Sequence, residues 1–201
     1  MSASQAPIHA FPSRAAWAAW VAQASAAGDE LGLWLQIAKA GSGIETVTYA
    51  QALEVALCHG WIDGQKRPLD EQYWLQRFTP RRARSKWSKI NRAKAEQLIA
   101  RGEMTAAGLR EVERARADGR WDAAYDSFSA GDVPEDLRAA LAARPGALAF
   151  FEALDRANRY AILYRVQEPK LAQTRARRIE QFAAMCEEGR TLHPPRARRG
   201  A

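Results

Sequence analysis

The segment from Gly60 to Asn91 holds most of the side chains in this chain that could do chemistry. Three stretches mix tryptophan, small hydroxyls, one aspartate and cations: Gly60-Trp61-Ile62-Asp63-Gly64, Arg77-Phe78-Thr79-Pro80-Arg81 and Ser85-Lys86-Trp87-Ser88-Lys89-Ile90-Asn91. Such a mixture suits a cleft that holds an anion, and it equally suits a core edged by turns. The residues predicted to bind a ligand are Trp61, Asp63, Arg77, Thr79, Arg81, Arg84, Trp87, Ser88 and Asn91.

Asp63 allows two interpretations. Alternation along a strand places Trp61 and Asp63 on one face and Ile62 on the other. In the structural interpretation, Ile62 enters the core and Asp63 accepts hydrogen bonds from a turn before Gly64. In the functional interpretation, Trp61 is the wall of a cleft and Asp63 is its anchor or general base.

The second stretch, Arg77 to Arg81, contains cations that could pair with Asp63. Arg77 and Thr79 share one face of a predicted strand, and we expect this face to lie near Asp63 if the two strands pair. Two outcomes then stay open. Asp63 forms an ion pair with Arg77 or Arg81, or the same groups form a small anion-binding cleft with Phe78 buried beneath them.

The third stretch, Ser85 to Asn91, is predicted to contain the start of a helix. Ser85 or Ser88 is expected to be the N-cap. A helix N-terminus preceded by arginines also suits an anion, because its free N–H groups and dipole favour negative charge. Trp87 then either packs in the core or covers that site. Together the stretches supply the parts of an enzyme site with Asp63 as base, whose other members would be Arg77, Thr79, Arg81, Ser88 and Asn91.

The elements that must position these residues predict an α+β fold. The sequence favours a small, mainly antiparallel sheet of residues 33–38, 61–67 and 73–79. Ser13 and a capping box of Thr48 with Gln51 begin two helices, and Gly60 is expected to end the second in a left-handed conformation. Helices are predicted at 14–26, 49–59, 89–101, 106–118, 134–143, 146–156, 158–168 and 172–188, so an all-helical portion follows the sheet.

Changes in composition and charge along the sequence divide the chain into regions. With 201 residues and 47% hydrophobic residues, it is long and apolar enough for a real core. We predict a disordered N-terminus at 1–12, an α+β domain at 13–126, a helical region at 133–189 and a basic disordered tail at 190–201.

Several functional classes receive no support from the motifs. No apolar run has the length of a membrane span, and the first residues do not resemble a secretory signal. Cys58 and Cys186 are far apart and are expected to be buried reduced thiols, so we expect a cytoplasmic protein. His59 is expected to cap or pack at a helix end. No metal-ligand spacing, cofactor fingerprint or nucleophile motif is present, and we expect neither a metal nor a cofactor.

The positive charge is unevenly distributed. The formal net charge is +7, and residues 77–101 hold nine Lys or Arg with Glu96 as their only acid. One basic segment in an otherwise balanced chain indicates an anionic partner.

A set of motifs resembles the YdeI/OmpD-associated, or bacteriocin-protection, family. It comprises Trp34-Leu35 with Lys39, Ala56-Leu57-Cys58-His59 leading into the Gly60–Gly64 stretch, the two basic stretches above, Gly108-Leu109, Gly119-Arg120-Trp121 and Thr174-Arg175-Ala176-Arg177-Arg178-Ile179. The resemblance implies a role in tolerating antimicrobial peptides or envelope stress. It also implies a front half like the small α+β domains of the YjbR and frataxin-like groups. His59 stands where the family typically has an aromatic residue.

Three functional hypotheses follow. The first is a non-enzymatic stress-protection protein that binds an anionic small molecule or macromolecule through the basic segment. The second is nucleic-acid binding, in which Trp74, Phe78 and Trp87 stack on bases between the cations. The third is an enzyme that acts on a small anionic substrate at the site built around Asp63.

The competing fold is an all-helical chain in which residues 33–38 and 73–79 are helical. Far-UV circular dichroism separates the two folds, because only the α+β chain gives a β-strand contribution to the spectrum. A spectrum without strand content would exclude the predicted sheet.

Overall fold

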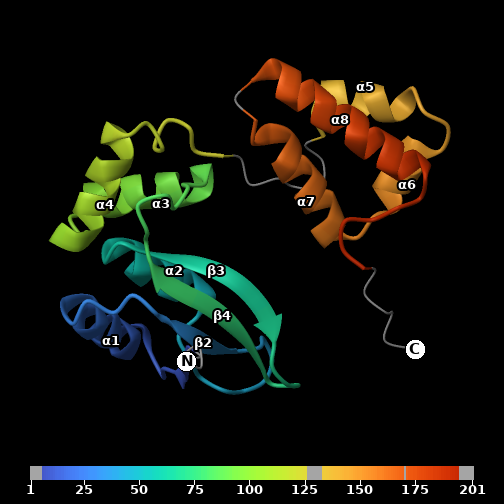
Figure 1. Cartoon of the computed structure of the whole chain (residues 1–201). Helices are drawn as coiled ribbons and strands as arrows, with labels where there is room; N and C mark the ends of the chain where they lie inside the picture. The colour runs from blue at the N-terminus through green and yellow to red at the C-terminus, as the bar shows by residue number, and fades with distance from the viewer. Residues whose placement is uncertain (1–5, 126–132, 170, 195–201) are drawn as a thin grey trace, which may run out of the picture. The chain divides into compact units, whose positions relative to one another are not determined.

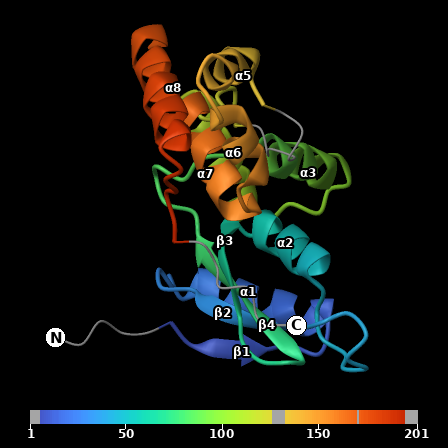
Figure 2. The same ribbon diagram turned by 90° about the vertical axis from the view of Figure 1, so that its right-hand side faces the viewer.

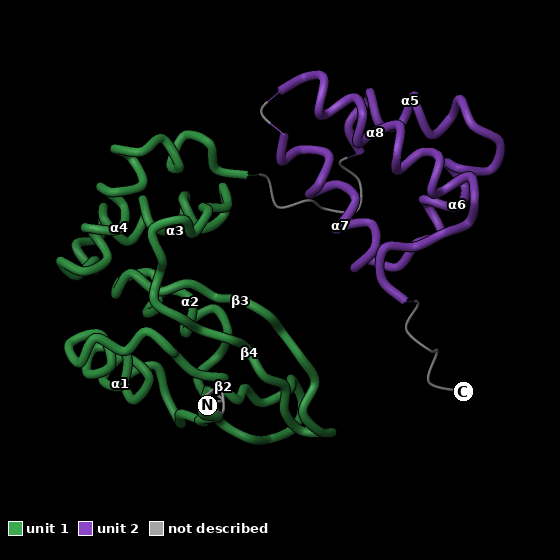
Figure 3. The backbone as a smooth tube through the Cα atoms, viewed as in Figure 1, with its two compact units in different colours: residues 1–126 green, residues 127–201 purple. Residues whose placement is uncertain are grey.

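The computed structural model divides into two compact units, residues 1–126 and 127–201 (Figure 1, Figure 3). The structure describes residues 6–125, 133–169 and 171–194. Within these ranges the first unit combines a sheet with helices, and the second contains helices without a strand. The predicted α+β class is therefore confirmed.

Four strands form one sheet in the order β1-β2-β4-β3. They are β1 (Ile8–Ala10), β2 (Leu33–Ala38), β3 (Trp61–Pro68) and β4 (Tyr73–Pro80). The pairs β2–β4 and β3–β4 are antiparallel, and the second contains a register shift between Asp63 and Lys66. The three predicted strands are confirmed to within one residue at each end, and the all-helical alternative is wrong.

The fourth strand, β1, corrects the prediction of a disordered N-terminus. Ile8–Ala10 runs parallel to Trp34–Gln36, and the ring of the next residue, Phe11, lies 5.3 Å from that of Trp17. A strand of three residues is too short to show an alternating pattern, so no periodicity marks it. Residues 1–5 of the predicted disordered segment lie outside the described ranges.

One face of the sheet is covered by α1 (Arg14–Ala26) and α2 (Tyr49–Cys58), as the turned view of Figure 2 also shows. Leu33, Leu35 and Ile37 point into this core, where they meet the buried rings of Trp17 and Phe78. Both helices begin as predicted. Ser13 accepts from the Ala16 amide, and Thr48 and Gln51 form a complete capping box.

Helix α2 is buried on its other side as well. There Leu53, Leu57 and Cys58 pack with residues of α3 (Lys89–Ala100) and α4 (Ala106–Ala117) in a second core. Gly60 follows α2 with a φ of 76°, which confirms the predicted left-handed stop. A Cβ at Gly60 would lie 3.0 Å from the Ala107 carbonyl oxygen of α4. The glycine therefore serves both the turn and the close approach of α4.

The second unit consists of α5 (Glu135–Ala142), α6 (Ala147–Ala153), α7 (Arg156–Gln167) and α8 (Ala172–Glu187), which share a core of their own. Buried Asn158 bonds the backbone of His193, accepting from its N–H at 2.9 Å and donating to its oxygen at 3.2 Å. The predicted disordered tail therefore begins too early at residue 190. Residues 195–201, like residues 127–132 between the two predicted regions, lie outside the described ranges.

Gly60 and Gly102 allow a matched test of this close approach. Each follows a helix with a left-handed φ, but nothing lies within 4 Å of a Cβ at Gly102. Gly102→Ala should cost about 1 kcal/mol of unfolding free energy from the backbone alone. Gly60→Ala should cost about 1 kcal/mol more, because it also crowds α4. Urea denaturation measures both, and equal losses would contradict the packing role.

Candidate functional site

Asp63 lies at the junction of three elements. Its two carboxylate oxygens accept from the Tyr49 hydroxyl of α2 at 2.8 Å and from the Asn91 amide of α3 at 3.3 Å. Burial, followed by the adjacent Asp63 carboxylate, raises the pKa of the Tyr49 phenol above its ordinary value. Tyr49 therefore stays a protonated donor, and the three side chains tie β3 to both helices.

The two predicted ligand-facing tryptophans are core residues. Trp61 is 1% exposed, and its indole N–H donates to the Ser25 hydroxyl at 2.8 Å. Trp87 is also 1% exposed, and its ring meets that of Trp121 edge to face at 4.8 Å. The interpretation of Trp61 as a cleft wall is wrong, and Trp87 packs in the core. Neither ring is available for stacking on a ligand.

Arg77 lies on the opposite face of the sheet from Asp63. The register pairs Asp63 with Phe78, so these two share a face while Arg77 and Thr79 occupy the other. The Arg77 guanidinium donates to the carbonyl oxygens of Leu31, Leu33 and Phe78. Our expectation that Arg77 and Thr79 lie near Asp63 is wrong.

This placement removes the six-residue catalytic arrangement. Arg77 and Thr79 cannot approach the carboxylate of Asp63 across the thickness of a sheet. The sequence predicts that side chains alternate along each strand, but it does not predict how the two strands pair. A shift of one residue in that pairing moves every side chain of one strand to the other face of the sheet.

Arg81 is the most deeply buried cation of the predicted site, at 6% exposure. Its guanidinium carbon lies 3.4 Å from the centre of the Trp87 ring, and Nη1 donates to the Lys86 oxygen at 3.2 Å. Burial lowers the pKa of Arg81 to about 10, although the nearby carboxylates of Glu111 and Asp63 oppose that shift. The predicted ion pair with Asp63 does not form between the two described side chains.

Several buried polar atoms around Arg81 lack hydrogen-bond partners within the described ranges. They are Nε and Nη2 of Arg81, Nε1 of Trp87 and Oε2 of Glu111. The other oxygen of Glu111 accepts from Arg114 at 2.9 Å. An unpaired buried donor costs about 1–3 kcal/mol, so stacking on Trp87 and the surrounding carboxylates must offset a real penalty.

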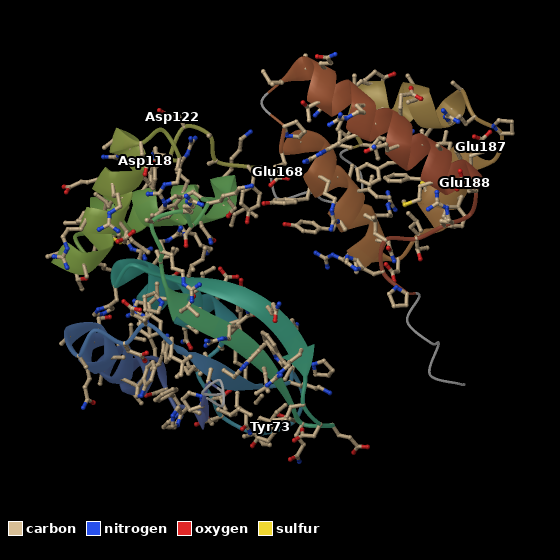
Figure 4. The ribbon with its side chains drawn as sticks, viewed as in Figure 1. Tyr73, Asp118, Asp122, Glu168, Glu187 and Glu188 are labelled. Atoms are coloured by element: carbon tan, nitrogen blue, oxygen red, sulfur yellow. The ribbon has the colours of Figure 1, made fainter. Side chains whose placement is uncertain are left out.

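The segment between Arg81 and α3 is held rigidly while its cations face outward. Arg82 and Ser85 exchange hydrogen bonds, with the Arg82 N–H donating to the Ser85 hydroxyl and the Ser85 N–H to the Arg82 oxygen, each at 2.9 Å. Arg120 donates to the Ser85 oxygen at 2.7 Å and to Asp118, which lies at the end of α4 (Figure 4). We call residues 82–88 the basic loop; Arg82, Arg84 and Lys86 are exposed on it.

The N-terminus of α3 is already occupied. Ser88, one of the two serines predicted for this role, is the N-cap and accepts from the Asn91 N–H at 3.1 Å. The Lys89 N–H donates to the Tyr125 oxygen at 2.8 Å. Because internal acceptors take these two amides, the helix start gives little support to the anion site predicted there.

The structure thus brings Asp63, Arg81, Trp87, Ser88 and Asn91 together, places Arg84 on the basic loop and separates Arg77 and Thr79 from them. The sequence analysis missed Tyr49, Glu111 and Arg120. Tyr49 directly follows Thr48, the N-cap of the capping box, a position that could have drawn attention to it. Arg120 stands in the Gly119-Arg120-Trp121 motif noted above, which could have pointed to it. Glu111 carries no local signal, because only tertiary packing brings it near Arg81.

The remaining chemistry of the described residues is sparse. They contain no cluster of three or more potential metal ligands. Among them no helix combines the length and apolar character that crossing a membrane requires. Cys58 and Cys186 are buried free thiols, and burial raises the pKa of each to about 11.

Fold and site together define a protein with an α+β unit followed by a helical unit. Residues 9–111 match a family described as a domain of unknown function (DUF8412), and because this match covers a little over half of the chain, the chain belongs to that family. Residues 130–189 match the family described as Bacteriocin-protection, YdeI or OmpD-Associated. No curated protein and no solved structure matches the chain.

The second match supports the resemblance in the sequence for the helical unit. It contains the stretch Thr174–Ile179. The motifs of residues 34–91 and 108–109 fall instead within the range of the first family. The suggestion of bacteriocin protection therefore rests on the C-terminal part of the chain.

The role of Arg81 in ordering the basic loop can be tested with a conservative change. Arg81→Lys keeps the charge but removes the planar group on Trp87 and the bond to the Lys86 oxygen. We expect a loss of about 1–2 kcal/mol in unfolding free energy. Arg84→Lys, on the exposed part of the same loop, should change it by less than about 0.5 kcal/mol. Thermal and urea unfolding measure both, and equal effects would refute this role.

Proposed function

We propose that this chain is a non-enzymatic protein of bacteriocin or antimicrobial-peptide protection that binds an anionic partner through its basic loop. The match of residues 130–189 supports the protective role. The observation that carries the binding role is a loop whose backbone is fixed while Arg82, Arg84 and Lys86 stay exposed. We further propose that it acts in the cytoplasm.

Rigidity is what distinguishes this loop from a solvated run of charges. Hydrogen bonds between Arg82 and Ser85 close the turn. The Arg120 side chain donates to the Ser85 carbonyl oxygen, and the Arg81 side chain donates to the Lys86 carbonyl oxygen. A partner that binds these cations therefore orders side chains only, and the smaller entropic cost favours binding. No acid interrupts the sequence from residue 77 to residue 95, so the local field stays positive.

The sign of this surface restricts the protective mechanism. Bacteriocins and antimicrobial peptides that are cationic would be repelled by the basic loop, so direct capture of such peptides is disfavoured. An anionic target, through which protection acts indirectly, agrees better with the charge. The separation of Asp63 from Arg77 favours binding over catalysis, because the groups of the predicted enzyme site do not converge.

A polyanion titration tests the binding role. Fluorescently labelled heparin serves as the probe, and Arg82→Ala with Arg84→Ala removes two exposed charges from the loop. We expect roughly tenfold weaker binding, equivalent to about 1.4 kcal/mol. Thermal stability should change little, since surface substitutions are usually within about 0.5 kcal/mol.

The matched control is Arg110→Ala with Arg177→Ala, which removes the same charge from exposed positions on α4 and α8. It should retain most of the affinity for heparin. If both double variants lose affinity equally, net charge alone explains the binding and the loop has no special role.

A further inference from the structure

We propose that the sheet face opposite α1 and α2 binds single-stranded nucleic acid. We call this the outer face. Residues paired across the strands share a face, and the register gives the pairs Trp34 with Arg77, Ala38 with Tyr73, Gln36 with Leu75, Arg67 with Leu75 and Ile62 with Thr79. Leu75 is buried at the middle of this face, at 2% exposure, and none of these residues belongs to the three apolar clusters of the described chain.

The outer face is positively charged. The strand residues that point to it include Arg67 and Arg77 but no aspartate or glutamate. Arg77 uses its guanidinium on backbone carbonyls and is fixed. Arg67 is exposed, and its guanidinium carbon lies 3.9 Å from the centre of the Trp34 ring. The face therefore offers one fixed and one adaptable cation beside an aromatic ring.

Two aromatic side chains are spaced along this face. Trp34 and Tyr73 are both partly exposed, and Tyr73 lies at the start of β4 (Figure 4). Tyr73 pairs with Ala38, four residues along β2 from Trp34. At about 3.3 Å per residue the two positions are about 13 Å apart along the strand. This corresponds to roughly four nucleotides at the ~3.4 Å spacing of a stacked strand.

This combination favours a nucleic acid over an acidic protein. Carboxylates would pair with Arg67 but would gain nothing from Trp34 and Tyr73. A single strand presents phosphates for the cations and unpaired bases for the rings, and open sheets use stacking aromatics in this way. The Arg67 guanidinium carbon lies over the Trp34 ring, so this ring already contacts a planar cation.

The aromatic residues differ from those first considered for nucleic-acid binding. Phe78 and Trp87 are fully buried, and Trp74 packs against the core formed with α1 and α2. The outer face is also distinct from the basic loop, so this proposal does not depend on the anionic partner proposed above.

Fluorescence anisotropy with a labelled twelve-residue oligothymidylate tests the proposal at about 50 mM salt. Trp34→Ala should weaken binding roughly five- to hundredfold, the range for loss of one stacked base. Trp34→Phe, which keeps a stacking ring, should retain most of the affinity. Arg67→Ala should weaken binding and reduce the slope of log affinity against log salt by about one.

The control is Arg110→Ala with Arg177→Ala, which removes two exposed cations of α4 and α8 that belong to neither the outer face nor the basic loop, and it should bind the oligonucleotide nearly as well as the unaltered protein. Circular dichroism checks the folding of each variant; if Trp34→Ala does not fold, Trp34→Phe and Arg67→Ala decide the question. Absence of binding to the unaltered protein would overturn the proposal. Equal affinity for the matching duplex, or an unchanged affinity in Arg67→Ala, would also overturn it.

Discussion

The first unit depends on the burial of α2 from two sides. One side of this helix closes the core under the sheet, and the other closes the core formed with α3 and α4. Six of the ten residues of α2 are buried, and a helix with two apolar sides is stable only where neighbours cover both of them. The sheet and the helices that follow it are thus coupled through the ten residues of α2. Gly60 turns the chain after this helix, and because it has no Cβ it also allows the close approach of α4.

This coupling explains why polar groups from different elements gather beside α2. Tyr49, Asp63 and Asn91 come from three different elements that the two cores force together. Arg81 enters the same region because its N–H bonds the Gly60 oxygen at 2.9 Å. Its guanidinium is buried against the Trp87 ring. The side chain then orders the basic loop from within while Arg82 and Arg84 stay exposed.

Much of this fold could be predicted from local signals. Caps at Ser13 and Thr48 and the glycine at position 60 mark helix ends through backbone chemistry that acts over a few residues. The site was less predictable. The faces of Asp63 and Arg77 depend on strand register, and the nearness of Glu111 to Arg81 depends on tertiary packing. Neither strand register nor tertiary packing can be predicted from the spacing of residues in the sequence.

The register shift in β3 also limits how the sheet can grow. β3 is an edge strand of eight residues, a length that would invite a strand from another molecule. The shift falls between Asp63 and Lys66, and the Gln76 amide fixes it by donating to the Gly64 oxygen at 2.8 Å. Beyond it stand two cations and Pro68, which lacks an N–H. A feature that orients side chains within one molecule thereby protects the protein against edge-to-edge aggregation.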